Sequence, residues 1–226
     1  LQAQENLITK DTKQAIDAGL AYLEKEQAKD GSWGTGNYKS SVAVTSLAGL
    51  AFLSGNHHPD RGDFGKSVTK AIRYVLKSED KDTTGFFQTQ TATHGPMYDH
   101  GFAVLFLADA HAALSDAKLK KEVNDALTRA VQLMLESQNA QGGWRYRPKP
   151  ADADISNTVC QVLALRAARD EGIGVPRTAL DGAIAYIKGC QNPDDGGFRY
   201  IQQGGPSGYA RTGAELGALH PPGGHG

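Results

Sequence analysis

Four glycine-rich turns, each ending in an aromatic side chain, divide this chain into units of nearly constant length. The aromatic residues are Trp33, Phe86, Trp144 and Phe198, and they are separated by 53, 58 and 54 residues. Each turn closes one apolar helical pattern and opens another. A period of this length, with two helical patterns inside it, predicts stacked helical hairpins.

The two helical patterns of each unit differ in how much apolar surface they carry. The first is amphipathic, with apolar residues three or four positions apart, as at Leu127, Val131 and Met134. The second is almost entirely apolar, as in 42–53 and 102–108, which is typical of a buried helix. We therefore expect an all-α fold of eight main helices in four hairpins. Its inner helices are expected at 41–53, 98–113, 154–169 and 209–219.

The turns and the inner helices repeat together. Aligning Thr45, Phe102, Thr158 and Thr212 as equivalent positions brings the inner helices into register at intervals of 57, 56 and 54 residues. Three turns also have a glutamine upstream: Gln27, Gln138 and Gln191. A glutamine amide can hydrogen-bond the end of a neighbouring helix, so these residues are expected to link adjacent hairpins. The four aromatic residues are accordingly expected to have structural roles in the repeat.

With these features the chain resembles the terpenoid cyclase and prenyltransferase superfamily, whose members are α/α toroids of paired helices with glutamine-tryptophan (QW) repeats. The resemblance covers residues 11–219 and is nearest to the squalene-hopene cyclase branch and to prenyltransferase and squalene oxidase repeat proteins. It rests on Gly142-Gly143-Trp144 followed by DISNTVCQVLAL at 154–165, in the order of the family's third unit. The resemblance implies a toroid around a central cavity.

One departure from the family pattern bears on catalysis. The cyclases carry an Asp-x-Asp-Asp-Thr motif whose middle aspartate protonates the substrate, and this chain has Asp154, Ser156 and Asn157 at the three acidic positions. A serine hydroxyl cannot replace the acid, because its pKa is far too high. A shifted alignment would instead place Asp152 and Asp154 at the first and middle positions. Asp154 can also serve as the N-cap of the inner helix, with no catalytic role.

The zinc site of protein prenyltransferases does not map onto the sequence. Those enzymes place a cysteine two residues after the zinc-binding aspartate, where this chain has Ser156, and Cys160 lies six residues after Asp154. The seven histidines show no paired metal-ligand spacing. We therefore expect neither a metal ion nor a cofactor.

Polar residues at the starts of the inner helices form the candidate site. Tyr98, Asp99 and His100 begin the second inner helix, and Tyr209 and Arg211 begin the fourth, so they are expected to face one central opening together with Asp154. The alternative is that these residues cap helices and link hairpins. The candidate catalytic residues are Asp99, His100, Asp152 and Asp154. The candidate ligand-binding residues are Tyr98, His100, Trp144, Arg145, Tyr146, Asp154, Ser156, Tyr209 and Arg211. Residues 144–147, on the loop before the third inner helix, are expected to form a rim of stacked arginine and aromatic groups.

Composition is consistent with one globular domain. The chain of 226 residues has 39% hydrophobic residues and a net charge of -1, which gives no electrostatic reason for binding nucleic acid. No apolar run is long enough for a transmembrane span. We expect a leader at 1–10, the repeat domain at 11–219 and a flexible tail at 220–226, with export after removal of a signal peptide. Cys160 and Cys190 lie on neighbouring elements, where a disulfide is one option.

Two classes of function remain open. The favoured class is a toroid that binds an apolar, isoprenoid-like molecule or a protein partner without catalysis. The alternative is an enzyme: a divergent isoprenoid cyclase or transferase, or a carbohydrate-active toroid that uses Asp99, Asp152 or Asp154. The family's closed rings have five to seven hairpins and this chain supplies four, so an open ring is expected. Its fourth inner pattern is then expected to meet another copy of the chain or further C-terminal hairpins.

Overall fold

The computed structural model describes residues 8–89 and 95–219 of the chain. The expected tail and most of the expected leader lie outside the described residues. The described part contains eight α-helices and a short 3-10 helix, and its only β-structure consists of isolated bridges, so the predicted all-α helical repeat is confirmed. The helices are α2 (Lys10–Glu26), α3 (Val42–Ser54), α4 (Gly65–Lys77), α5 (Pro96–Ala113), α6 (Ala117–Ser137), α7 (Ile155–Asp170), α8 (Arg177–Gly189) and α9 (Tyr209–Leu219), and the 3-10 helix is η1 (Gly36–Tyr38).

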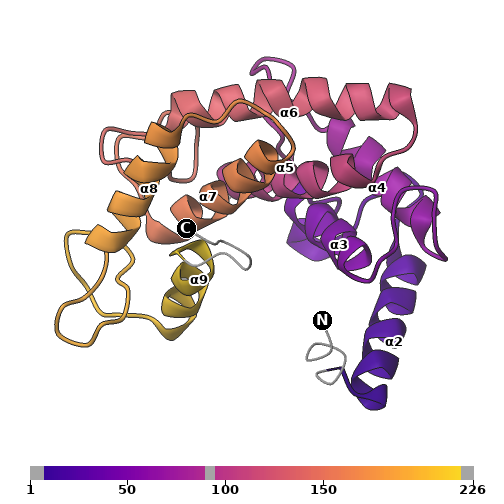
Figure 1. Cartoon of the computed structure of the whole chain (residues 1–226), viewed down its shortest axis with the longest axis horizontal. Helices are drawn as coiled ribbons and strands as arrows, with labels where there is room; N and C mark the ends of the chain where they lie inside the picture. The colour runs from indigo at the N-terminus through magenta and orange to yellow at the C-terminus, as the bar shows by residue number, and fades with distance from the viewer. Residues whose placement is uncertain (1–7, 90–94, 220–226) are drawn as a thin grey trace.

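The helices alternate along the chain between two layers. Helices α3, α5, α7 and α9 pack against one another in succession, and we call them the inner helices. Helices α2, α4, α6 and α8 are the outer helices, and each packs against an inner helix. Figure 1 shows these layers as an open arc, with α2 at one end and with α8 and α9 at the other.

Burial follows the pattern that the sequence predicts for the middle of the arc. Outer helix α6 buries one face, including Leu127, Val131 and Met134. Inner helix α5 is buried along most of its length, because neighbours cover it on several sides. Helix α2 differs from the other outer helices, since Leu20 is its only buried residue.

Each turn is fixed by one hydrogen bond to the following inner helix. The N–H groups of Trp33, Trp144 and Phe198 donate to the Oγ1 atoms of Thr45, Thr158 and Thr212 at 3.0, 3.2 and 3.1 Å. In the second unit the N–H of Phe87 donates to Nδ1 of His100 at 3.3 Å. Phe87, and not Phe86 as the sequence spacing predicts, is therefore the equivalent of Trp33, Trp144 and Phe198. His100 likewise takes the position that the alignment of the inner helices gives to Phe102.

A glutamine side chain joins two of the turns to the next outer helix. Nε2 of Gln138 donates to the carbonyl of its own turn and to the carbonyl of Ala179 in α8, at 2.7 and 2.8 Å. Gln27 makes the same pair of bonds, the second of them to Ser67 in α4 at 3.0 Å. All three upstream glutamines were expected to link successive hairpins. Gln27 and Gln138 do so, whereas Gln191 bonds only to the carbonyl of its own turn among the described residues.

Glu79 occupies the equivalent position in the second unit and links the hairpins through an ion pair. Its carboxylate accepts the N–H of Gly85 at 2.8 Å. It also accepts two hydrogen bonds from Arg129 of α6, at 2.8 and 2.6 Å. A bidentate Arg–carboxylate pair therefore replaces the glutamine amide at this junction.

The first glycine of each turn has a left-handed backbone conformation. The φ angles of Gly31, Gly85, Gly142 and Gly196 are 95°, 79°, 89° and 72°. Gly142 also lies so close to α8 that an added Cβ would be 2.4 Å from the carbonyl oxygen of Gly182. Only glycine meets both requirements, the positive φ and the close backbone approach.

In the part of the chain that the structure describes, no helix is both long enough and apolar enough to cross a membrane.

Candidate functional site

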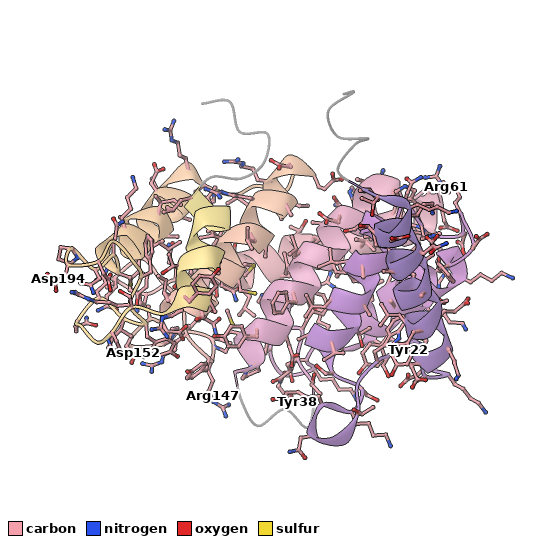
Figure 2. All side chains as sticks on the ribbon, turned by 90° about the horizontal axis from the view of Figure 1, so that it is seen from below. Tyr22, Tyr38, Arg61, Arg147, Asp152 and Asp194 are labelled. Carbon is pink, nitrogen blue, oxygen red and sulfur yellow. The ribbon has the colours of Figure 1, made fainter. Side chains whose placement is uncertain are left out.

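A cavity of about 660 Å³ lies between the N-terminal ends of α3 and α5. Of the candidate residues, Tyr98, Asp99 and Tyr146 line it. Among the described residues, the lining consists of Asn37, Tyr38, Ser41, Ala43, Val44, Thr89, Gly95, Tyr98, Asp99, Tyr146 and Arg147. Figure 2 shows Tyr38 and Arg147 at the same edge of the molecule. The cavity thus combines apolar and aromatic walls with a few polar groups, as small-molecule sites commonly do.

Asp99 links the two helices that form the cavity. Its Oδ1 accepts the N–H of Ala43 in the first turn of α3 at 2.8 Å, and its Oδ2 accepts the N–H of Thr89 at 3.0 Å. The hydroxyl of Thr89 in turn accepts the N–H of Val42 at 2.9 Å. Asp99 therefore caps a neighbouring helix, and both of its oxygens already accept hydrogen bonds.

Tyr98 forms the boundary between the cavity and the start of α7. Burial raises the pKa of its hydroxyl well above the usual value, and the nearby carboxylate of Asp154 adds to this, whereas a hydrogen bond with Ser156 opposes it. The ring of Tyr98 also contacts that of Tyr146, with 6.4 Å between the centroids. The phenol of Tyr98 is therefore protonated at neutral pH and can act only as a neutral hydrogen-bonding group.

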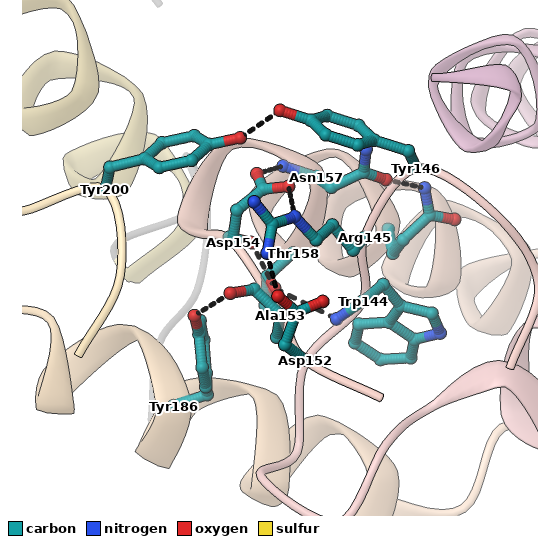
Figure 3. Close-up of polar contacts among 11 residues, drawn as sticks. Trp144, Arg145, Tyr146, Asp152, Ala153, Asp154, Asn157, Thr158, Tyr186 and Tyr200 are labelled. Atoms are coloured by element: carbon teal, nitrogen blue, oxygen red, sulfur yellow. Dashed lines mark hydrogen bonds and ion pairs between the residues drawn. The ribbon is translucent and has the colours of Figure 1, made fainter. Parts of the chain in front are cut away.

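Arg145 is held between two carboxylates and two aromatic rings (Figure 3). Its Nη1 forms an ion pair with Asp152, and its Nε lies 4.0 Å from Oδ2 of Asp154. Its guanidinium carbon lies 5.3 Å from the ring centroid of Tyr146 and 6.0 Å from that of Tyr200. These two tyrosine hydroxyls are hydrogen-bonded to each other. The cluster joins the loop before α7 to the loop before α9.

Asp154 is the N-cap of α7 and is fully buried. Its Oδ1 accepts the N–H of Asn157 at 2.8 Å. Burial raises the pKa of Asp154 above the usual value, although this hydrogen bond and Arg145 act in the opposite direction. Asp154 is not among the residues that line the cavity. Its geometry is that of the capping role that the sequence left open as an alternative.

His100 lies in the interior rather than at the cavity. It is fully buried, its Nδ1 accepts the N–H of Phe87 and its Nε2 is 3.3 Å from the carbonyl oxygen of Ala130 in α6. Burial lowers its pKa to about 4. The ring is therefore neutral at pH 7, with its proton on Nε2, and it connects a turn to an outer helix.

The remaining candidates lie away from the cavity. Trp144 is fully buried, and its Nε1 donates to the carbonyl of Met134 at 2.8 Å. Tyr209 is 98% exposed. The guanidinium of Arg211 donates to backbone carbonyls of its own hairpin, those of Phe198 and Pro206. The structure therefore does not bring Tyr209 and Arg211 together with Tyr98 and Asp99.

Two aromatic residues of the site were missed as candidates from the sequence, Tyr200 beside Arg145 and Tyr38 in the cavity. The lining residues Asn37, Ser41, Ala43, Val44 and Thr89 were missed as well. The repeat contains a signal for Tyr200, because Gly-Gly-Phe-Arg-Tyr at 196–200 parallels Gly-Gly-Trp-Arg-Tyr at 142–146. Tyr38 belongs to η1, a short element with no equivalent among the described residues of the other units. No sequence pattern marks it.

Neither cysteine chemistry nor a metal centre is evident among the described residues. Burial raises the pKa of the Cys160 thiol to about 12, and no disulfide joins it to Cys190. Such a thiol is protonated and unreactive at neutral pH. In the described ranges, no group of three or more His, Cys, Asp or Glu side chains is arranged to hold a metal ion.

Comparison with known proteins adds a distant relationship. No family model matches the chain. A drimenyl diphosphate synthase from Streptomyces showdoensis is 28% identical over 197 residues, which make up 85% of this chain and 33% of that protein. A second drimenyl diphosphate synthase, from Streptantibioticus cattleyicolor, is 37% identical over 84 residues, or 37% of this chain and 15% of that protein. Both support a terpenoid cyclase-like relationship. The chain spans about a third of the length of the first relative.

Proposed function

We propose that this chain is a terpenoid cyclase-like repeat protein that binds an apolar, isoprenoid-like molecule in the cavity between α3 and α5, without catalysing cyclisation. The cavity carries the proposal. Its volume of about 660 Å³ lies within the range of small-molecule sites, and its walls include Tyr38, Tyr98, Tyr146, Ala43 and Val44. Aromatic and aliphatic walls favour a hydrocarbon chain over a strongly hydrated ligand.

The carboxylates near the cavity are poorly placed for proton transfer. Asp99 lines the cavity, but each of its oxygens accepts a backbone N–H. Asp154 caps α7 and does not line the cavity, and Ser156 occupies the position of the family's acid. Protonation of an alkene needs a carboxylic acid that reaches the substrate, so this arrangement favours binding over cyclisation.

The comparisons support a ligand of this class. The relatives are named for the synthesis of a terpenoid diphosphate, and the similarity to one of them extends over 85% of this chain. A carbohydrate-active site is less well supported, because Asp99 is the only carboxylate among the described residues that line the cavity. Glycoside hydrolysis usually requires two facing carboxylates.

Native mass spectrometry with farnesol as the probe tests the proposal. We expect one farnesol per chain and loss of binding in Ala43→Trp, because the indole would fill the cavity. Ala185→Trp is the matched control, since Ala185 lies on the exposed side of α8 and the variant should bind normally. Absence of farnesol binding, or equal binding by both variants, contradicts the proposal. Failure with farnesol together with capture of a defined protein would favour a protein-partner function instead.

A further inference from the structure

The contact between successive hairpins has the same two halves in the first and third units, whereas the second unit uses the Glu79–Arg129 ion pair. The junction of the third unit with α8 shows the two halves. One half is the turn before α7, which supplies the amide of Gln138, the backbone at Gly142 and the carbonyl of Ala153. The other half is α8, in which Ala179 accepts the amide, Gly182 lies against the turn glycine, and the hydroxyl of Tyr186 donates to Ala153 at 2.6 Å.

The junction of the first unit with α4 has the same register. Gln27 donates to Ser67, a Cβ at Gly31 would lie 2.5 Å from the carbonyl oxygen of Lys70, and Tyr74 donates to Ser40. These three α4 residues precede Glu79 by 12, 9 and 5 positions, and the three α8 residues precede Gln191 by the same numbers. The contact is therefore a repeated interface with a fixed spacing.

The turn between α8 and α9 presents the first half of this interface, and no described outer helix docks on it. We call residues 191–208 the docking turn. Nε2 of Gln191 donates to the carbonyl of Gly196 at 3.2 Å and has no acceptor on an outer helix among the described residues. A Cβ at Gly196 would meet nothing within 4 Å, whereas one at Gly142 would be 2.4 Å from α8.

Helix α2 presents the second half. Its residues 15–23 read AIDAGLAYL and residues 179–187 of α8 read ALDGAIAYI, with Gln27 and Gln191 at the same distance downstream. In α8 this face is covered, and Leu180 and Tyr186 are 5% and 1% exposed. In α2 the equivalent Ile16 and Tyr22 are 42% and 63% exposed. No described turn docks on this receiving face, which consists of Ala15, Ile16, Ala18, Gly19 and Tyr22.

We infer that α2 of a second copy of this chain docks on the docking turn, so that copies associate head to tail. The amide of Gln191 then donates to the carbonyl of Ala15, Gly196 packs against Ala18, and the hydroxyl of Tyr22 donates to the carbonyl of Ser207. Ser207 is the correct acceptor because Gly208, like Asp154, donates its N–H to the aromatic residue of its turn. The two halves lie at opposite ends of the arc (Figure 1), so one copy can use both.

A second copy of the chain fits the docking turn because the two halves are complementary. Within the described ranges, no outer helix docks on the docking turn and no turn docks on α2, whose residues have the register that the docking turn requires. Burial of Ile16 and Tyr22 supplies the apolar driving force, as it does for Leu180 and Tyr186 inside the chain. Such a heterologous contact closes into a ring where its rotation allows and otherwise extends the assembly.

Light scattering coupled to size-exclusion chromatography tests the inference. We expect the associated fraction to rise with protein concentration. The dissociation constant should be larger by roughly tenfold or more in Tyr22→Ala and in Gln191→Ala. Leu47→Ala is the matched control, because Leu47 is 46% exposed, lies outside both halves and does not line the cavity, so this variant should associate like the wild type. A protein that remains monomeric at all concentrations overturns the inference.

Photo-crosslinking identifies the contact itself. With p-benzoylphenylalanine at position 22 and a mixture of isotopically light and heavy chains, we expect inter-chain crosslinks to residues 198–208. Crosslinks to other regions, or association that is insensitive to both Tyr22→Ala and Gln191→Ala, overturn the assignment. If position 22 crosslinks only to a further hairpin, in a longer polypeptide that carries one, that hairpin occupies the receiving face and a second copy is excluded.

Discussion

Replacement of His100 by threonine is expected to make the stability of the protein less dependent on pH. His100 is fully buried, and desolvation lowers its pKa to about 4 from the ordinary histidine value of 6.5. The imidazole binds its proton more tightly in the unfolded state than in the folded state. The contribution of neutral His100 to the free energy of unfolding is therefore fully present above pH 6.5 and is lost as the pH falls towards 4. A difference of this size corresponds to about 3 kcal/mol across that window. Threonine is the appropriate replacement, since Thr45, Thr158 and Thr212 occupy the same position in the other units.

Urea unfolding of wild type and His100→Thr between pH 4 and pH 8 measures the effect. Other titrating groups are common to both proteins, so the difference between the two curves isolates the histidine. We expect the free energy of unfolding of the wild type to fall more steeply below pH 6.5, by up to about 3 kcal/mol in total. We expect the variant to be less stable at every pH, because threonine fills less volume than histidine. The test therefore compares only the slopes of the two curves with pH. Parallel curves for the two proteins would refute the reasoning.

Two further predictions concern the turns and the chemistry. Gly142→Ala should destabilise the protein by several kcal/mol, because the alanine would have a positive φ and a Cβ 2.4 Å from the carbonyl oxygen of Gly182. Gly196→Ala in the monomer should cost about 1–2 kcal/mol, for the backbone conformation alone. Equal losses of stability in thermal unfolding would argue against the repeated interface. The purified chain should not cyclise squalene or oxidosqualene. Changing Ser156 and Asn157 to aspartate should give little cyclase activity, because the neighbouring groups that tune the pKa of the acid must also be present. Cyclised product above background in gas chromatography would show that the chain has a proton donor.

The helical repeat could be predicted from the sequence because its signals are local and recur four times. Apolar periodicity placed the inner helices within a few residues of α3, α5, α7 and α9. The second turn was placed one residue early, at Phe86, because it contains two adjacent phenylalanines. In the other turns the aromatic residue lies two positions after the left-handed glycine, and this spacing selects Phe87.

The site was less predictable, because it depends on how the repeats are placed in space. Arg145, Tyr146 and Asp154 do meet, since they flank one short loop. Tyr209 and Arg211 were expected beside them on the basis of register alone, but the loop before α9 directs Arg211 to its own hairpin. An aspartate at the start of an inner helix can be either an acid in the cavity or a helix cap, and the sequence alone does not distinguish the two. The hydrogen bonds of Asp99 and Asp154 show that both cap helices.

Hydrogen–deuterium exchange with and without farnesol tests most directly the claim that the cavity between α3 and α5 is a ligand site. We expect farnesol to slow exchange in peptides that cover residues 38–44 and 95–99, with no change in α8, which lies away from the cavity. The same experiment on Ala43→Trp should show no farnesol-dependent protection. Protection that appears elsewhere, or no protection at saturating farnesol, would contradict the proposed function.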